Sequence, residues 1–119
     1  MDADLTDAQL DELRAALEAL QAALPGLIAG AKERSRTVDL DQPIGRLTRM
    51  DAMQQRAMAQ EECRRHEIRK LQIGAAMLAL DAGTYGECRS CGEPIGYVRL
   101  AARPESPMCM PCMRSREQR

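Results

Sequence analysis

The 119-residue sequence contains no phenylalanine and no tryptophan, and it has only two tyrosines. Aromatic side chains supply much of the buried area of a thick globular core, so their scarcity argues against such a core. Alanine, leucine and methionine carry the apolar content instead, and all three favour helices. Because 29% of the residues are charged, the composition predicts an elongated, helical protein with large solvated faces.

Long apolar runs and a strong net charge are missing as well. No run of about 18 apolar residues exists, so we expect no transmembrane segment. The amino terminus is acidic and has no cationic segment before an apolar one, which excludes a secretory signal and predicts a cytoplasmic protein. The formal net charge of −1 gives no overall field that would draw the chain to nucleic acid or a membrane.

The first third of the chain has the pattern of an amphipathic helix. Its leucines follow alternating spacings of three and four residues and are Leu10, Leu13, Leu17, Leu20, Leu24 and Leu27. This a/d repeat predicts a helix that packs against a helical partner, strongest over residues 7–24, with Thr6 as its amino-terminal cap. Pro25-Gly26 interrupts the pattern, so we expect a kink or a short break there, with Leu27 and Ile28 keeping the register.

Residues 43–82 form a second candidate helix, because Pro43 is their only proline. Asp41 is a reasonable cap, and Pro43 suits the first turn. The apolar residues that mark a predicted second seam are Met50, Met53, Ala57, Ile68, Leu71, Ala75 and Leu78. Cys63 is interpreted as a small helix residue, His66 as a surface residue, and Met50, Met53 and Met58 as seam and tip packing.

Neither helix can bury its apolar stripe alone, so the two should fold back on each other. We therefore predict a mainly α fold, in which residues 1–82 form a long antiparallel coiled-coil hairpin with its tip near 37–48. After Gly83 the composition changes, and residues 83–119 hold four of the five cysteines. This second region is expected to be a small zinc-finger module with a short carboxyl-terminal helix, from about Pro111 to Arg119.

Four of the cysteines form the pattern Cys-x2-Cys-x17-Cys-x2-Cys, and they are Cys88, Cys91, Cys109 and Cys112. Each pair can turn two thiolates toward one metal, and two pairs complete a tetrahedron. A region this small, without large apolar residues, needs such a metal to fold. The pattern predicts one structural Zn²⁺, and iron is the alternative metal. The alternative to any metal site is a set of unligated or redox-active thiols. Four cysteines leave no open position for a substrate.

Several arginines lie close in sequence to these cysteines, namely Arg89, Arg99, Arg103 and Arg114. The interpretation that we favour is that they offset the formal charge of −2 on a zinc–thiolate cluster. Contact with nucleic acid is the alternative, but only Tyr85 and Tyr97 could stack on bases.

The run "GTYGECRSCGEPIGYVRLAARPESPMCMPC" at residues 83–112 closely resembles the zinc-finger signature of the DksA/TraR family of bacterial transcription factors. The likeness includes Gly86, Gly92 and Ile95 besides the four cysteines, and it continues through "RLAARP" at 99–104. The preceding helical hairpin agrees with the family's architecture.

The resemblance implies a non-enzymatic protein that binds bacterial RNA polymerase directly rather than specific DNA sequences. In the family the hairpin enters the secondary channel of the polymerase, where acidic residues at the tip approach the catalytic centre. Promoter complexes are modulated as a result, often jointly with the nucleotide ppGpp. The zinc module and the carboxyl-terminal helix rest on the channel rim. A monomer is expected.

The tip residues to which this role is assigned are Asp39, Asp41, Arg46, Arg49, Asp51 and Ala52. The family's acidic arrangement at the tip, Asp-x-x-Asp-x-Ala, is absent from this stretch. Asp39 and Asp41 are acids one turn before the expected position of this motif. Asp51 lies one turn after that position and is followed by Ala52. Both aspartates of the first pair also suit a turn or a helix start without any further role.

Other classes of function remain open on the sequence alone. One is a zinc-ribbon protein that binds nucleic acid, another is a redox sensor whose thiolates release zinc on oxidation, and a third is a homodimeric coiled-coil adaptor. An enzyme is not expected, because no histidine or carboxylate cluster accompanies a nucleophile or an open metal position.

Overall fold

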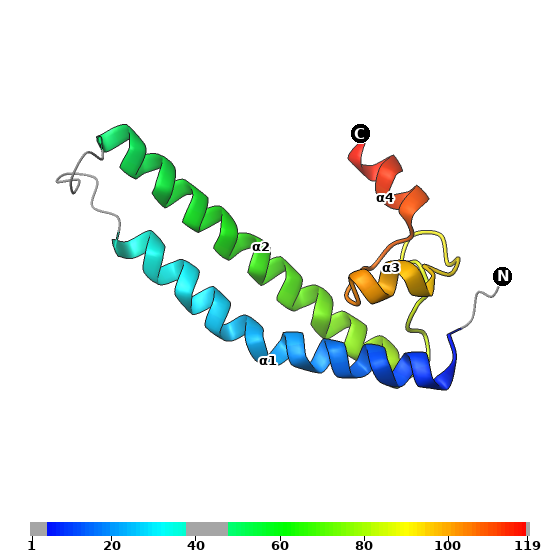
Figure 1. Ribbon diagram of the computed structural model, residues 1–119. Coiled ribbons are helices and arrows are strands. Elements are labelled where there is room, and N and C mark those ends of the chain that lie inside the picture. The colour runs from blue at the N-terminus through cyan, green and yellow to red at the C-terminus, as the bar shows by residue number, and fades with distance from the viewer. Residues whose placement is uncertain (1–4, 38–47, 119) are drawn as a thin grey trace. The chain divides into compact units, whose positions relative to one another are not determined.

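The computed structural model describes residues 5–37 and 48–118, and it is helical through most of this length (Figure 1). Its helices are α1 (Asp7–Thr37), α2 (Arg49–Ala82), α3 (Tyr97–Ala102) and α4 (Met110–Glu117). The only β feature among the described residues is an isolated antiparallel bridge between Glu87 and Pro94. In this part of the chain no helix combines the length and the apolar content that crossing a bilayer requires. The prediction of a mainly α fold with a long antiparallel helix pair is confirmed.

Helix α1 begins where the sequence predicts. The Thr6 hydroxyl accepts a hydrogen bond from the backbone N–H of Gln9 at 3.1 Å, and the Gln9 side chain accepts one from the Thr6 N–H at 3.0 Å. This reciprocal capping box satisfies two amide donors that the first turn would otherwise leave unpaired. The helix then continues through Pro25 to Thr37, so the short break offered as one outcome at Pro25-Gly26 is absent.

Helix α2 begins later than the sequence suggests, at Arg49 rather than near Pro43. Its cap is Thr48, whose hydroxyl accepts a hydrogen bond from the Asp51 N–H at 3.0 Å, while the Asp51 carboxylate accepts one from the Thr48 N–H at 3.3 Å. The assignment of Asp41 as the cap of α2 is therefore wrong. A Thr-x-x-Asp box just before a long helical stretch was the sequence signal for the correct start.

Helix α2 ends at Ala82 because Gly83 takes a left-handed conformation with a φ of 80°. The N–H of Thr84 donates to the Ala79 carbonyl at 2.9 Å, and the N–H of Gly83 donates to the Leu80 carbonyl at 3.3 Å. These two bonds form a Schellman motif, which requires a residue at C′ that tolerates positive φ. Gly83 is thus the predicted end of the helix.

The described chain divides into two compact units. The first consists of residues 1–21 and 71–119, and the second of residues 22–70. In the first unit the end of α1 that contains Leu13 and Leu17 is buried together with Ile73 of α2. An ion pair of 3.6 Å between Arg14 and Asp81 joins the two helices, and both partners are solvent-exposed enough that it adds little stability.

In the second unit the antiparallel pairing is visible from its ion pairs. Lys32 lies 3.7 Å from Glu67 and Arg34 lies 2.6 Å from Glu62, so positions rise along α1 as they fall along α2. The buried residues of this unit are Leu24, Ile28, Ala31, Ala52 and Ala59. Three of these five side chains are alanines, so the described helix pair of this unit buries little apolar area.

The predicted seam of α2 is wrong. Its large members are exposed: Met50, Met53, Ile68, Leu71 and Leu78 are 43–75% accessible, and Met58 is 70% accessible. The buried positions are instead Ala52, Ala59 and Ile73, which follow a strict seven-residue repeat that also includes His66. On α1, Leu27 is exposed and Ile28 is buried, so Ile28 alone keeps the register after Pro25.

His66 occupies the one polar position of that repeat. Its side chain is only 20% exposed, and its Nε2 lies 3.4 Å from the Glu62 carboxylate. The interpretation of His66 as a surface residue is therefore corrected. Glu62 in turn binds Arg34, and this hydrogen bond is the main cause that lowers the pKa of Glu62 below its ordinary value.

Candidate metal centre

The finger begins with a tight loop immediately after the end of α2. Cys88 and Cys91 lie in this loop, which Gly92 closes with a φ of 77°. The Gly92 N–H donates to the Cys88 carbonyl at 2.9 Å, and the Cys88 N–H donates to the Glu93 carbonyl at 2.7 Å. A side chain at position 92 would strain this backbone, so the glycine is required by the turn.

The second pair of cysteines stands at the start of α4. Cys109 is the amino-terminal cap residue of this helix, and Pro111 lies in its first turn, where no backbone donor is needed. Cys112 follows one turn after Cys109. The two pairs are joined by a backbone hydrogen bond of 2.8 Å from the Arg89 N–H to the Pro107 carbonyl.

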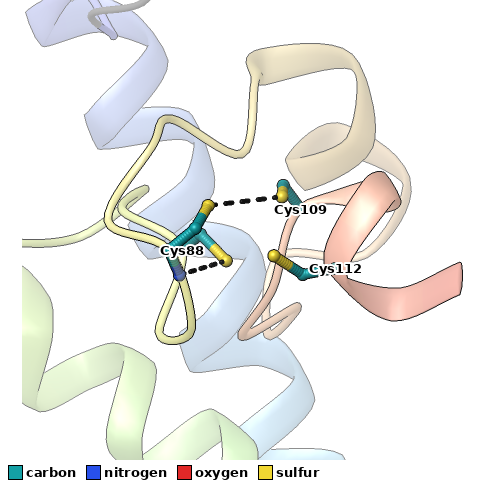
Figure 2. A group of neighbouring side chains, drawn as sticks. Cys88, Cys109 and Cys112 are labelled. Carbon is teal, nitrogen blue, oxygen red and sulfur yellow. Dashed lines mark hydrogen bonds between the residues drawn. The ribbon is translucent and has the colours of Figure 1, made fainter. Parts of the chain in front are cut away.

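The four sulfur atoms converge on one point. Cys88, Cys91, Cys109 and Cys112 each offer a sulfur, and these atoms all lie within 4.8 Å of one another. Figure 2 labels three of these cysteines, with the sulfurs of Cys88, Cys109 and Cys112 turned toward a common centre. The Cys91 and Cys109 sulfurs are 3.7 Å apart. Tetrahedral Zn²⁺ with bonds of about 2.3 Å would place its sulfurs about 3.8 Å apart, so the donor set fits zinc.

Hydrogen bonds from the backbone also favour the thiolate form of Cys88. The backbone N–H groups of Ser90 and Cys91 lie 3.4 and 3.5 Å from the Cys88 sulfur. Burial raises the pKa of the Cys88 thiol, but hydrogen bonds from the backbone at Cys109, Cys91 and Ser90 outweigh burial and lower the pKa overall. In Cys112, hydrogen bonding to Cys109 and then to Cys91 raises the pKa. The lowered pKa favours the thiolate form of Cys88, which is the form that binds a metal ion.

A small core supports the metal centre. Cys88, Met108 and Cys109 are buried, with Ile95, Cys112 and Met113 packed against them. The Arg99 Nε donates to the Met108 carbonyl at 3.1 Å, which ties α3 to the segment that carries the second cysteine pair. This set contains few large apolar residues, so the metal must supply much of the free energy that folds the finger.

Two of the arginines near the cysteines have structural partners. Arg99 binds the Met108 carbonyl, and the Arg103 Nε donates to the buried carboxylate of Glu105 at 3.2 Å. Glu105 also raises the pKa of Tyr85, second to the burial of the phenol, and together they raise it to about 12. The Tyr85 hydroxyl donates to the Pro104 carbonyl at 2.8 Å. The sequence pattern did not single out Glu105 or the role of Tyr85.

Only some of the residues assigned to the tip lie in the described part of the chain, and these differ in exposure. Asp39, Asp41 and Arg46 lie outside the described residues. Arg49 and Asp51 are exposed in the first turn of α2, whereas Ala52 is completely buried and offers no side-chain surface to a partner.

Comparison with known proteins identifies the finger. The family described as prokaryotic dksA/traR C4-type zinc finger matches residues 83–118. Among curated proteins, the chain is 40% identical over 63 residues to the RNA polymerase-binding transcription factor DksA of Haemophilus influenzae, and 40% identical over 57 residues to that of Caulobacter vibrioides. These stretches cover 51% and 46% of the chain but only 43% and 40% of the two relatives, so the chain matches less than half the length of either.

A solved structure extends the likeness to the helices. Transcription factor DksA2 from Pseudomonas aeruginosa aligns with a TM-score of 0.69 and 29% sequence identity, covering 94% of this chain and 85% of that one. The finger, the curated relatives and this shared architecture agree with one another. Residues 83–118 accordingly form a zinc finger of the prokaryotic dksA/traR C4 type, whose four cysteines are placed to hold one zinc ion, and the chain as a whole is similar to transcription factor DksA2.

Proposed function

We propose that the chain is a transcription regulator that binds bacterial RNA polymerase directly. The observation that carries the proposal is the agreement between the finger and the helix pair. Two curated relatives, each 40% identical over about half of this chain, are named as RNA polymerase-binding factors, and the similar solved structure covers 94% of this chain. The closed set of four thiolate ligands has no vacancy for a substrate, which supports a role without catalysis.

The finer proposal is that the connection between α1 and α2 enters the secondary channel of the polymerase. This connection joins the carboxyl end of α1 to the amino end of α2, and its sequence carries two acids. Asp39 and Asp41 are the acids that we assign to that segment, with Asp51 as the alternative. Carboxylates placed near a catalytic Mg²⁺ could compete for the ion or its water ligands, because Mg²⁺ prefers oxygen ligands. Binding of ppGpp together with the polymerase is part of the same proposal.

The test is co-purification of the zinc-loaded chain with bacterial core RNA polymerase, followed by transcription in vitro with and without ppGpp. We expect a stable complex at micromolar concentration and a changed yield from promoters that form short-lived complexes. Absence of a complex at that concentration would refute the proposal. A ppGpp-dependent difference would assign the nucleotide to this complex, and its absence would remove ppGpp from the proposal.

Paired variants separate the two candidate acidic groups. The double variant Asp39→Asn/Asp41→Asn should lose the transcriptional effect while it still binds polymerase. Asp51→Asn removes the other acid but also weakens the cap of α2, so Thr48→Ala is its control, because it breaks the same cap and keeps the acid. If Asp51→Asn alone abolishes the effect and Thr48→Ala does not, the active acid is Asp51. An unchanged effect in all three variants would contradict an acidic mechanism.

A further inference from the structure

An apolar row lies on the solvent-facing side of α2, near its carboxyl end. Leu71 and Leu78 are 75% and 71% exposed, and Ala75 and Ala82 are exposed as well. We call these four residues the outer stripe. Leu71 and Ala75 each stand two positions from the completely buried Ile73, and two positions correspond to about 200° of rotation in a helix. The outer stripe therefore lies opposite the buried seam of α2.

The outer stripe has the spacing of a second coiled-coil seam. Its members are separated by four, three and four residues, which places the two leucines at heptad position d and the two alanines at position a. Single exposed leucines are common on protein surfaces, but apolar residues repeated in this register mark a surface that another helix covers. Within residues 5–37 and 48–118 nothing covers it. Neither the zinc site nor the proposed acidic segment uses it.

The sizes of the side chains make the outer stripe complementary to itself. When two copies of α2 pack antiparallel about a two-fold axis, each a position faces a d position of the partner subunit. In the register that covers all four residues, Leu71 faces Ala82 of the partner subunit, and Leu78 faces Ala75 of the partner subunit. Every layer then combines one leucine with one alanine, which fills the contact evenly. A parallel pair would stack leucine on leucine and alanine on alanine, in layers of unequal thickness.

The residues that flank the outer stripe allow the same arrangement. In an antiparallel pair the g positions face each other, and so do the e positions. Asp81 at position g faces Gly74 of the partner subunit, and Gln72 at position e faces Ala79 of the partner subunit. No two like charges therefore meet beside the outer stripe, whereas like-charge contacts are what usually forbid a pairing. Gly74 has no side chain, so it also leaves room for the Asp81 carboxylate.

We propose that the outer stripe binds the outer stripe of a second copy of this chain, in an antiparallel dimer with two-fold symmetry. Two leucines and two alanines from each copy bury less than the total of about 1,200 Å² that stable complexes need. The dimer is therefore weak and forms at high micromolar concentration. At low concentration the chain remains the monomer that the family resemblance implies. The proposal does not depend on binding to polymerase.

The experiment measures the mass of the zinc-loaded full chain by sedimentation from micromolar to millimolar concentration. We expect the average mass to rise from that of a monomer toward that of a dimer. Leu78→Gln should weaken dimerisation about tenfold or more, because each dimer loses two buried leucines. The matched control is Val98→Gln, which removes an exposed apolar residue of α3 outside the outer stripe, and it should dimerise as the natural chain does. Zinc content and circular dichroism confirm that each variant is folded.

A pair of variants at position 74 tests the orientation of the two helices. A Cβ at this position meets nothing within 4 Å, so Gly74→Lys and Gly74→Glu differ mainly in the sign of their charge. Each faces Asp81 of the partner subunit, whose side chain is 72% exposed although it lies 3.6 Å from Arg14. Gly74→Lys should therefore tighten the dimer and Gly74→Glu should weaken it, and salt should reduce the difference. In a parallel dimer position 74 faces Ala79, and the two variants would have equal affinities.

Four results would overturn the proposal. The first is the mass of a monomer at millimolar concentration. The second is an equal loss of dimer in Leu78→Gln and Val98→Gln, which would mean general apolar association. The third is equal affinity of Gly74→Lys and Gly74→Glu, which would exclude the antiparallel arrangement. The fourth is a natural chain that stays monomeric but loses binding to polymerase in Leu78→Gln, which would assign the outer stripe to the polymerase.

Discussion

The Tyr97 hydroxyl donates hydrogen bonds to the carboxylate of Glu12, with both oxygens at 2.8 Å, across 85 positions of sequence. Tyr97 begins α3 of the finger, and Glu12 lies in the second turn of α1. This contact therefore holds the finger against the amino-terminal helix within one compact unit. The bond to Glu12 is also the main cause that raises the pKa of Tyr97 above its ordinary value.

Removing that hydroxyl tests the contact. Tyr97→Phe should lower the melting temperature of the zinc-loaded chain and should increase amide hydrogen exchange in α3, because the phenol loses its acceptor. Glu12→Gln keeps an acceptor but removes the charge, so its effect should be smaller. Equal melting temperatures and equal exchange in Tyr97→Phe and the natural chain would show that the contact does not stabilise the finger.

Metal removal is the second prediction. A strong chelator should abolish the chemical-shift dispersion of NMR signals from residues 84–118, because the finger has little apolar core of its own. Much of the helical circular dichroism of α1 and α2 should remain. Cys112→Ser should lower zinc content in the same way. Cys63→Ser is the matched control, since Cys63 lies on α2 outside the sulfur cluster, and it should retain one zinc per chain.

The third prediction concerns the polar position in the seam of α2. His66→Leu should raise the free energy of unfolding by about 1 kcal/mol, and with it the melting temperature, because a mostly buried position gains apolar area. The gain outweighs the weak 3.4 Å contact to Glu62 that the histidine makes. Leu71→His on the exposed face of α2 is the control and should change stability little. A lower melting temperature in His66→Leu would show that the polar cluster stabilises the helix pair.

Two glycines give opposite predictions. Gly86 has a φ of 95°, and a Cβ there would lie 3.3 Å from the Leu5 side chain, so Gly86→Ala should cost about 1–3 kcal/mol of unfolding free energy. Gly74 lies inside α2, where an added Cβ would meet nothing within 4 Å. Gly74→Ala should therefore stabilise by about 0.5–1 kcal/mol. Denaturant unfolding of both variants checks the sign, and stabilisation by Gly86→Ala would contradict the strained backbone.

The fifth prediction is a loss of stability in alkali that depends on Tyr85. Folding raises the pKa of this phenol from 10.0 to about 12, first through burial and then through Glu105. Below pH 10 the Tyr85 phenol is protonated in both the folded and the unfolded state, so its full contribution to the free energy of unfolding is present. From pH 10 to 12 the unfolded state loses its proton first, so stability falls as pH rises.

Denaturant titration of zinc-loaded protein across pH 9–12 measures that loss, with Tyr85→Phe as the comparison. Tyr85→Phe should lose about 0.5–1.5 kcal/mol at neutral pH, because the hydrogen bond to Pro104 is gone. Its stability should then depend less on pH in the alkaline range. Identical alkaline slopes in the two proteins would place the titration on another group.

The sequence predicted those parts of the fold in which a residue type and its spacing allow few local structures. Paired cysteines converge because two Cys-x2-Cys turns satisfy one tetrahedral ion, and Gly83 ends α2 because a Schellman motif needs positive φ. Leu13, Leu17 and Leu24 are buried as their spacing predicts. These features depend on local geometry or on a strong repeat, which a single sequence displays.

The seam of α2 could not be found in this way. Its buried positions carry Ala52, Ala59 and Ile73, with the half-buried His66 between them, while the large apolar residues Leu71 and Leu78 lie on an exposed face. A search for large apolar residues follows that exposed face, whereas two of the three buried positions carry alanine. The seven-residue spacing of Ala52, Ala59, His66 and Ile73 was the usable signal.

The capping box of α2 has a consequence for the carboxylate of Asp51. One of its oxygens already accepts the Thr48 N–H at 3.3 Å. A cation or a basic loop that takes over this carboxylate must compete with the helix for it, and success releases the amide of Thr48. Engagement of Asp51 would therefore appear as fraying of the first turn of α2, with faster amide exchange from Arg49 onward. Amide exchange at the start of α2 would therefore report whether a partner binds the Asp51 carboxylate.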